Sequence, residues 1–151
     1  MRDAVGGTFM MYVFLIFLTV YITFVAVAFN YARAFRVKNK VIDIIEQNEG
    51  MTNADFNNLS GANNSGVAGQ INEYLNDVQY NISLSSRNRN GRGICFDRGY
   101  CIDEINAVSD IDGVSASYYK VTTFVKLEIP FLELGFTIPV KGETRKIERI
   151  S

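Results

Sequence analysis

A single uncharged stretch near the start of the chain constrains its fold more than any other sequence feature. No charged residue occurs between Ala4 and Ala32, and residues 8–29 consist mostly of Phe, Val, Leu, Ile, Met and Ala. At about 1.5 Å per residue, a helix over this run spans about 30 Å, the hydrocarbon thickness of a bilayer. Because lipid offers no partner to backbone polar groups, we expect a transmembrane helix. A removable secretory signal is the alternative, but its apolar core normally has only about 7 to 15 residues.

The helical pattern continues beyond the apolar run and becomes one-sided. Between residues 33 and 49, apolar side chains recur at spacings of three and four residues, which is typical of an amphipathic helix. These residues are Ala34, Val37, Val41, Ile44 and Ile45. Gly and Pro are absent from residue 8 until Gly50, so one helix of about 40 residues is predicted to combine the span with a stalk.

Four basic residues follow the apolar run, namely Arg33, Arg36, Lys38 and Lys40. We interpret them as an interfacial anchor that meets phosphate headgroups. Such a cluster favours a cytoplasmic position for the residues that follow it. The short head before the run and the cysteine pair described below favour the other side, and we predict an extracytoplasmic C-terminal domain.

The residues after the stalk predict a connection and a second helix. Residues 50–65 are rich in Asn, Gly and Ser, which is typical of a linker. Within it, Thr52 and Asp55 match a capping box that begins one short helical turn. Residues 66–79 predict a helix, because their apolar side chains share one helical face. The members of this face are Val67, Ile71, Tyr74, Leu75 and Val78.

Segments with alternating side chains predict a small antiparallel sheet. Residues 80–84 are predicted as a first strand, and residues 119–129 show the clearest alternation. Residues 136–147 are predicted to return beside them, with a bulge near Gly142. One face of this hairpin needs a cover, which the stalk or helix 66–79 can supply. The predicted fold is α+β, with a leader (1–7), a transmembrane and stalk helix (8–49), a linker (50–65) and a head (66–151).

Two cysteines lie close together in the sequence, Cys95 and Cys101. Their spacing lets the side chains face each other across a tight loop at the distance that a disulfide requires. A bridge that closes so short a ring is expected to stabilise the fold by about 2 to 3 kcal/mol. Two reduced thiols are an alternative, and a metal site is disfavoured because the chain has neither His nor a third Cys. A disulfide implies an oxidising compartment.

Composition argues against several classes of function. The chain has 15 Lys+Arg, 16 Asp+Glu and no His, so it lacks the positive charge of a nucleic-acid binder and the commonest general base. Arg87, Arg89 and Arg92 occupy a polar loop that we interpret as a solvated turn rather than a phosphate-binding site. We find no nucleophile beside a base, and we predict no catalysis, cofactor, metal or small-molecule substrate.

The order of these features resembles a known family. A short head with a basic residue (residues 1–7, MRDAVGG) precedes the apolar helix, an amphipathic stalk follows, and a small α+β domain comes last. This layout is similar to that of type IV pilin-like proteins. Within that group the paired strands most resemble TadE-like minor pilins of tight-adherence systems. The segments that carry this resemblance are residues 121–130 (VTTFVKLEIP) and 138–145 (IPVKGETR).

The resemblance implies processing and a structural function. A prepilin peptidase would cut after Gly7 and make Thr8 the new N-terminus. Main pilins carry Glu at the fifth mature position, where this chain has Tyr12. The resemblance therefore favours a minor or accessory subunit of a surface pilus, secretion or conjugation machine, located in the cell membrane. Its implied partners are membrane lipid and other single-span subunits. The alternative is a single-pass anchored extracytoplasmic binding module that never assembles.

Overall fold

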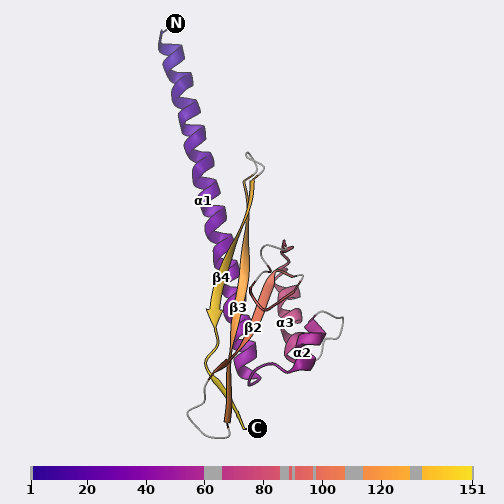
Figure 1. The fold of residues 1–151 in the computed structure, drawn as a ribbon. Coiled ribbons are helices and arrows are strands. Elements are labelled where there is room, and N and C mark those ends of the chain that lie inside the picture. Colours follow the sequence, from indigo (N-terminus) through magenta and orange to yellow (C-terminus); the bar gives the residue numbers. More distant parts are fainter. Residues whose placement is uncertain are drawn as a thin grey trace.

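The computed structural model describes residues 2–59, 66–85, 89, 91–96, 98–107, 114–129 and 134–150. The helices along these residues are α1 (Arg2–Gln47), α2 (Asn53–Leu59) and α3 (Gly66–Asp77). The strands are β1 (Ile94–Phe96), β2 (Tyr100–Ala107), β3 (Val114–Ile129), β4 (Leu134–Glu143) and β5 (Ile147–Ile150). The first half of α1 projects from the domain as a rod, and its second half lies along the sheet (Figure 1). The predicted α+β combination of a long apolar helix with an antiparallel sheet is confirmed.

α1 is one unbroken helix of 46 residues, about 70 Å long. It ends at Gln47, close to Gly50, where the sequence predicted that the helix would stop. Glu49 and Gly50 adopt positive φ angles of 56° and 99°, and the Gly50 N–H donates a hydrogen bond to the Ile45 carbonyl at 2.9 Å. This is a left-handed C-cap, which satisfies a terminal carbonyl and turns the chain toward α2.

The predicted capping box begins α2, and it also reaches α3. The Thr52 N–H and hydroxyl donate to one carboxylate oxygen of Asp55 at 2.9 and 2.7 Å, and the Asp55 N–H donates to the Thr52 hydroxyl at 3.3 Å. The other carboxylate oxygen accepts the Val67 N–H at 3.2 Å. Burial opposes ionisation of Asp55, but these hydrogen bonds outweigh it and hold the pKa of the carboxyl below its ordinary value.

β3 is the central strand of the sheet. It pairs antiparallel with β2 along one side and with β4 and then β5 along the other. The return strand is therefore interrupted. The bulge predicted near Gly142 is misplaced, because β4 pairs in regular register through Glu143 and the irregularity falls at residues 144–146. At the break the Thr144 N–H donates to the Tyr119 carbonyl at 2.9 Å, and the Tyr119 N–H donates to the Thr144 hydroxyl at 2.9 Å. A side-chain oxygen replaces a backbone acceptor here, which is how one extra residue is accommodated.

The predicted strand at residues 80–84 is wrong, and β1 and β2 were not predicted. Residues 80–85 form no strand, although Tyr80 and Leu84 are buried. Their alternation instead reflects a bridging segment, an irregular stretch that packs on the sheet without joining it. Its Ile82 N–H donates to the Arg98 carbonyl at 3.2 Å. β2 instead forms the ladder next to β3, and β1 pairs with the other edge of β2.

Both candidate covers pack on the same face of the sheet. α1 contributes Val37, Val41 and Ile45 to the main core, and α3 contributes Ile71 and Leu75. The sheet residues in this core are Tyr100, Ile102, Tyr119 and Val121. Apolar residues of both predicted amphipathic faces therefore join one core, and the second half of α1 is fixed to the domain on which it lies.

Candidate functional site: the exposed helix and its junction with the sheet

The first half of α1 exposes apolar side chains in all directions. Gly6–Gln47 is long and apolar enough to cross a membrane, and no residue of its most apolar stretch is buried. Phe9, Phe17 and Phe24 are 68%, 71% and 71% exposed. Every residue from 9 to 18 is exposed, which at 3.6 residues per turn covers the whole circumference of the helix. A surface of this kind suits lipid or other apolar helices.

Two threonine hydroxyls of this half bond back to the backbone of their own helix. The hydroxyls of Thr19 and Thr23 donate to the carbonyls of Leu15 and Thr19, each at 2.9 Å. Bonding back to the preceding turn leaves no hydroxyl of this pair directed at a neighbour. The predicted processing residues Gly7 and Thr8 lie in α1 and are exposed, and a Cβ at Gly7 would meet nothing within 4 Å.

The helix surface changes from exposed to buried at Ala34. Tyr31 is 51% exposed and Ala34 only 1%, because β3 meets the helix at this point. The Thr123 hydroxyl donates to the Ala34 carbonyl at 3.0 Å, and Ala34 packs with Val125 and Val140. The small alanine side chain lets the sheet approach the helix backbone closely. This contact fixes the sheet domain one turn beyond the apolar run.

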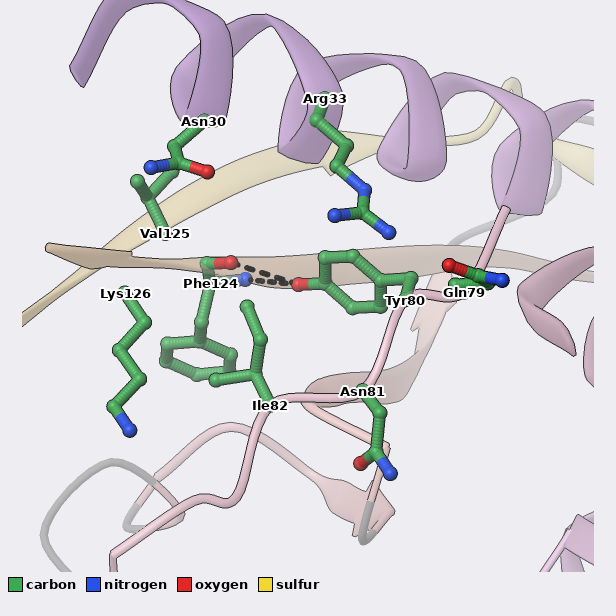
Figure 2. Close-up of a pocket in the computed structure, with 9 residues that line it drawn as sticks. All are labelled: Asn30, Arg33, Gln79, Tyr80, Asn81, Ile82, Phe124, Val125 and Lys126. Atoms are coloured by element: carbon green, nitrogen blue, oxygen red, sulfur yellow. Dashed lines mark hydrogen bonds between the residues drawn. The ribbon is translucent and has the colours of Figure 1, made fainter. Parts of the chain in front are cut away.

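Two of the four predicted anchor residues line hollows at this junction. Arg33 donates to the Val78 carbonyl from one side of a hollow of about 160 Å³ (Figure 2). A second hollow, of about 470 Å³, is lined by Arg33 and Arg36 together with Tyr74 and Val78. In a helix that crosses a bilayer, guanidinium groups directly after the apolar run would lie at the depth of the lipid phosphates.

Lys38 departs from the predicted anchor because it is buried, whereas Lys40 remains partly exposed. Lys38 is buried, and its ammonium lies 4.1 Å from the centre of the Phe35 ring. Its position four residues after Ala34 places it on the stripe of α1 that faces the sheet. Lys40 pairs with Asp43 at 2.8 Å.

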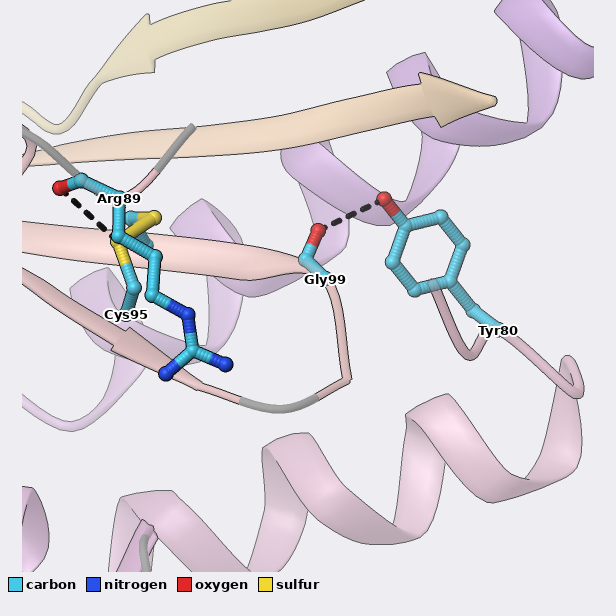
Figure 3. Close-up of a disulfide and its surroundings, with 5 residues drawn as sticks. Tyr80, Arg89, Cys95 and Gly99 are labelled. Atoms are coloured by element: carbon cyan, nitrogen blue, oxygen red, sulfur yellow. Dashed lines mark hydrogen bonds between the residues drawn. A yellow bond between two sulfur atoms is a disulfide. The ribbon is translucent and has the colours of Figure 1, made fainter. Parts of the chain in front are cut away.

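Tyr80 completes the sheet where β2 ends, a function that the sequence did not reveal. The pairing of β2 with β3 stops at Tyr100 and Thr123, so the next residue, Phe124, has no strand partner on that side. The Tyr80 hydroxyl accepts the Phe124 N–H at 2.9 Å and lies 2.8 Å from the Phe124 carbonyl (Figure 2). The Gly99 carbonyl is 3.0 Å from the same hydroxyl (Figure 3). Burial raises the pKa of Tyr80 to about 12.

The predicted cysteine pair forms a disulfide. Cys95 and Cys101 are directly paired between β1 and β2, with an S–S distance of 2.00 Å (Figure 3). Cys101 is fully buried and packs with Leu84 and Phe124 on the sheet face away from α1. The disulfide belongs to the sheet domain, whereas Gly7 and Thr8 lie near the far end of the rod, so the structure does not bring these predicted sites together.

Among the residues that the structure describes, no group of three or more His, Cys, Asp or Glu is placed to hold a metal ion. Comparison of the chain with protein-family models, curated proteins and solved structures found no match. The functional argument therefore depends on the exposed helix, its junction with the sheet and the disulfide.

Proposed function

We propose that this chain is a membrane-anchored, pilin-like subunit of the TadE-like kind, with an accessory and non-catalytic function in a surface pilus, secretion or conjugation machine. The observation that carries this proposal is the continuity of α1. Its first half is apolar and exposed all round, and its second half is built into the core of a sheet domain. In the proposal the first half lies in the bilayer and the domain stands outside the cytoplasm.

Rigid coupling between span and domain supports an assembly function. α1 contains no break between the apolar run and the junction at Ala34, where Thr123 and Val125 hold the sheet. Any helix packing that orients the span therefore also orients the domain. Spans of this composition associate through van der Waals packing rather than through a hydrophobic driving force, because lipid is equally apolar. The function needs no reaction, only insertion, lateral packing and display.

The disulfide supports an extracytoplasmic domain. Bonds of this kind persist in oxidising compartments and are rare in the cytoplasm. A membrane-impermeant thiol reagent should label Cys95 and Cys101 on intact cells only after reduction. Labelling that needs cell lysis but no reduction would reverse the proposed orientation.

Membrane fractionation and N-terminal mass spectrometry test the anchor and the pilin-like processing. The chain should remain in the membrane fraction until detergent is added, and its mature N-terminus should be Thr8. Membrane association with an intact Met1 would favour an anchored binding module that does not assemble. Full-length chain dissolved in a detergent-free extract would overturn the proposal.

Photo-crosslinking tests the assembly step. A photoreactive residue at Phe17, which is 71% exposed in the span, should form adducts with other single-span proteins. The matched position is Ile94, 47% exposed on the edge strand β1, where adducts with spanning helices are not expected. Adducts from Phe17 to lipid alone would contradict assembly while leaving the anchor intact.

A further inference from the structure

The end of the β3–β4 hairpin carries exposed apolar side chains beside the apolar half of α1. This inference rests on the proposed membrane anchor: we propose that this end of the hairpin inserts Phe136 into the bilayer surface that α1 crosses, with Ile138 at the depth of the headgroups. The sheet domain would then touch the membrane at a second point.

The direction of β3 points the hairpin toward the span. Tyr119 hydrogen-bonds Met51 just beyond the end of α1, and Thr123 bonds Ala34 further up the helix. β3 therefore runs antiparallel to α1, and the hairpin rises beside the helix toward its N-terminal end (Figure 1). No other described part of the sheet domain reaches as far in this direction (Figure 1).

Val125 packs on Ala34, so these two residues lie at the same height along the axis of α1 and serve as the reference point. Two further residues of β3 advance about 7 Å, equivalent to about four residues of helix. Leu127 and its cross-strand partner Phe136 are thus level with the region of Asn30. The end of β3, four residues beyond Val125, is level with about Val25. The hairpin end therefore lies beside the last turns of the apolar run.

The exposed side chains lie on the face of the hairpin that looks toward α1. Val125 on this face contacts Ala34, and cross-strand partners share a face, so Ile138 opposite Val125 and Phe136 opposite Leu127 belong to it. Phe136 is 51% and Ile138 43% exposed, because α1 and the hairpin separate above the junction (Figure 1). The hairpin side of this opening carries Phe136 and Ile138, and the helix side becomes apolar from Phe29 toward the N-terminus.

Continuity with the span identifies lipid as the occupant. At the level of Phe136 the other wall of the opening is the end of the helix segment proposed to lie in the bilayer, so the medium around that segment also fills the opening. Arg33 and Arg36 lie one to two turns below this level, at headgroup depth. The described end of β3, level with Val25, lies about 6 Å inside the end of the apolar run, which is within the depth that interfacial segments reach.

A second contact would restrict the motion of the domain. A single helix can tilt and rotate about its own axis in the bilayer. A hairpin inserted beside it fixes which side of the domain faces the membrane and which side remains available to partners.

Tryptophan fluorescence tests this proposal with unusual clarity, because the natural chain contains no Trp. Three single variants of the full chain are reconstituted in phosphatidylcholine vesicles with and without brominated acyl chains. Phe136→Trp reports on the hairpin and Phe24→Trp on the span. Ile94→Trp is the matched control, since Ile94 is 47% exposed and lies on β1, paired through β2 with the part of β3 that is distant from the span.

Brominated lipid should quench Phe136→Trp and Phe24→Trp and leave Ile94→Trp unchanged, whereas acrylamide should quench Ile94→Trp most strongly. Acrylamide quenching of Phe136→Trp as strong as that of the control, without an effect of bromine, would overturn the proposal by placing the hairpin in water. Protection of Phe136→Trp from both quenchers would overturn it in favour of a covering protein, such as a second copy. Absence of bromine quenching at Phe24→Trp would reject the membrane anchor itself.

Discussion

The hydroxyl of Thr123 donates a hydrogen bond to the main-chain carbonyl of Ala34 across the junction between β3 and α1, at 3.0 Å. Thr123 is fully buried, and from Gly6 onward Ala34 is the first buried residue of the helix. This bond joins the sheet to the helix at the point where the rod leaves the domain. Removing this bond therefore tests the rigid coupling between the helix and the sheet, on which the proposed assembly function depends.

Thr123→Val preserves shape and removes the hydroxyl. Because the Ala34 carbonyl keeps its helical partner, the expected loss in free energy of unfolding is about 0.5 to 1.5 kcal/mol. Denaturant unfolding of the detergent-solubilised chain measures it. Thr137→Val, at a partly exposed position of β4, should change stability little and serves as control. Equal stability of the two variants would contradict a structural function of the bond.

Tyr80→Phe should destabilise the domain more strongly. It leaves the buried N–H and carbonyl of Phe124 without the hydroxyl that bonds them, at an expected cost of about 1 to 3 kcal/mol. Tyr118→Phe, at a partly exposed position of β3, is the matched control. A loss at Tyr80 no larger than that at Tyr118 would show that the sheet edge finds another partner.

Tyr80 also predicts an alkaline loss of stability. The ordinary pKa of tyrosine is about 10, and burial raises that of Tyr80 to about 12. Between these values the unfolded chain loses a proton that the folded chain keeps, so stability falls as pH rises, by up to about 1.4 kcal/mol per pH unit. Burial also raises the pKa of Tyr100, which adds to the slope. In Tyr80→Phe the slope between pH 10 and 12 should be shallower.

Asp55 predicts a loss of stability in acid. Its folded-state pKa lies below the ordinary value of about 3.9, so its contribution is present above that pH and disappears as pH falls. Asp55→Asn should lower stability near neutral pH by about 1 to 2 kcal/mol, because hydrogen bonds to a charged acceptor are stronger than those to a neutral one, and should remove part of the acid dependence. Denaturant midpoints from pH 7 to pH 3 measure both effects. Parallel acid profiles for the two proteins would contradict this account.

Reduction of the disulfide should destabilise the domain by about 2 to 3 kcal/mol. The expected effect is modest because the stabilisation from a disulfide grows with the length of the closed loop, and this loop is short. Thermal unfolding with and without a reductant measures the difference. The double variant Cys95→Ser, Cys101→Ser should not respond to the reductant. A response of that variant would mean that the reductant acts elsewhere.

A charge at the middle of the apolar run should hinder membrane integration. At the centre of a spanning helix, the Phe17→Lys substitution raises the free energy of membrane insertion by about 2.5 to 3.5 kcal/mol. We expect a reduced carbonate-resistant membrane fraction, while Phe17→Leu should integrate normally. Equal integration of both variants would contradict this expected cost.

Local patterns were sufficient for the elements whose residues interact with near neighbours in the chain. The apolar run and the three- and four-residue spacing predicted one long helix ending near Gly50, and α1 ends at Gln47. The spacing of Thr52 and Asp55 predicted the capping box, and that of Cys95 and Cys101 the disulfide. Each of these interactions closes over a few residues, so the sequence interval alone defines its geometry.

Long-range packing decided the features that were missed. Alternation in residues 80–84 reports burial of every second side chain, and it cannot distinguish a strand from a bridging segment that lies on a sheet. The burial of Lys38 and the bond from Tyr80 to Phe124 depend on where the sheet meets the helix.

By itself the sequence determined that a charge-free helix continues into an amphipathic one, because hydrophobicity and helical period are written along the chain. Only the tertiary structure decided which face of that helix carries the sheet and how far the β3–β4 hairpin rises beside it. Those relationships join residues about 90 positions apart, such as Ala34 and Thr123, and no local pattern specifies the register between them.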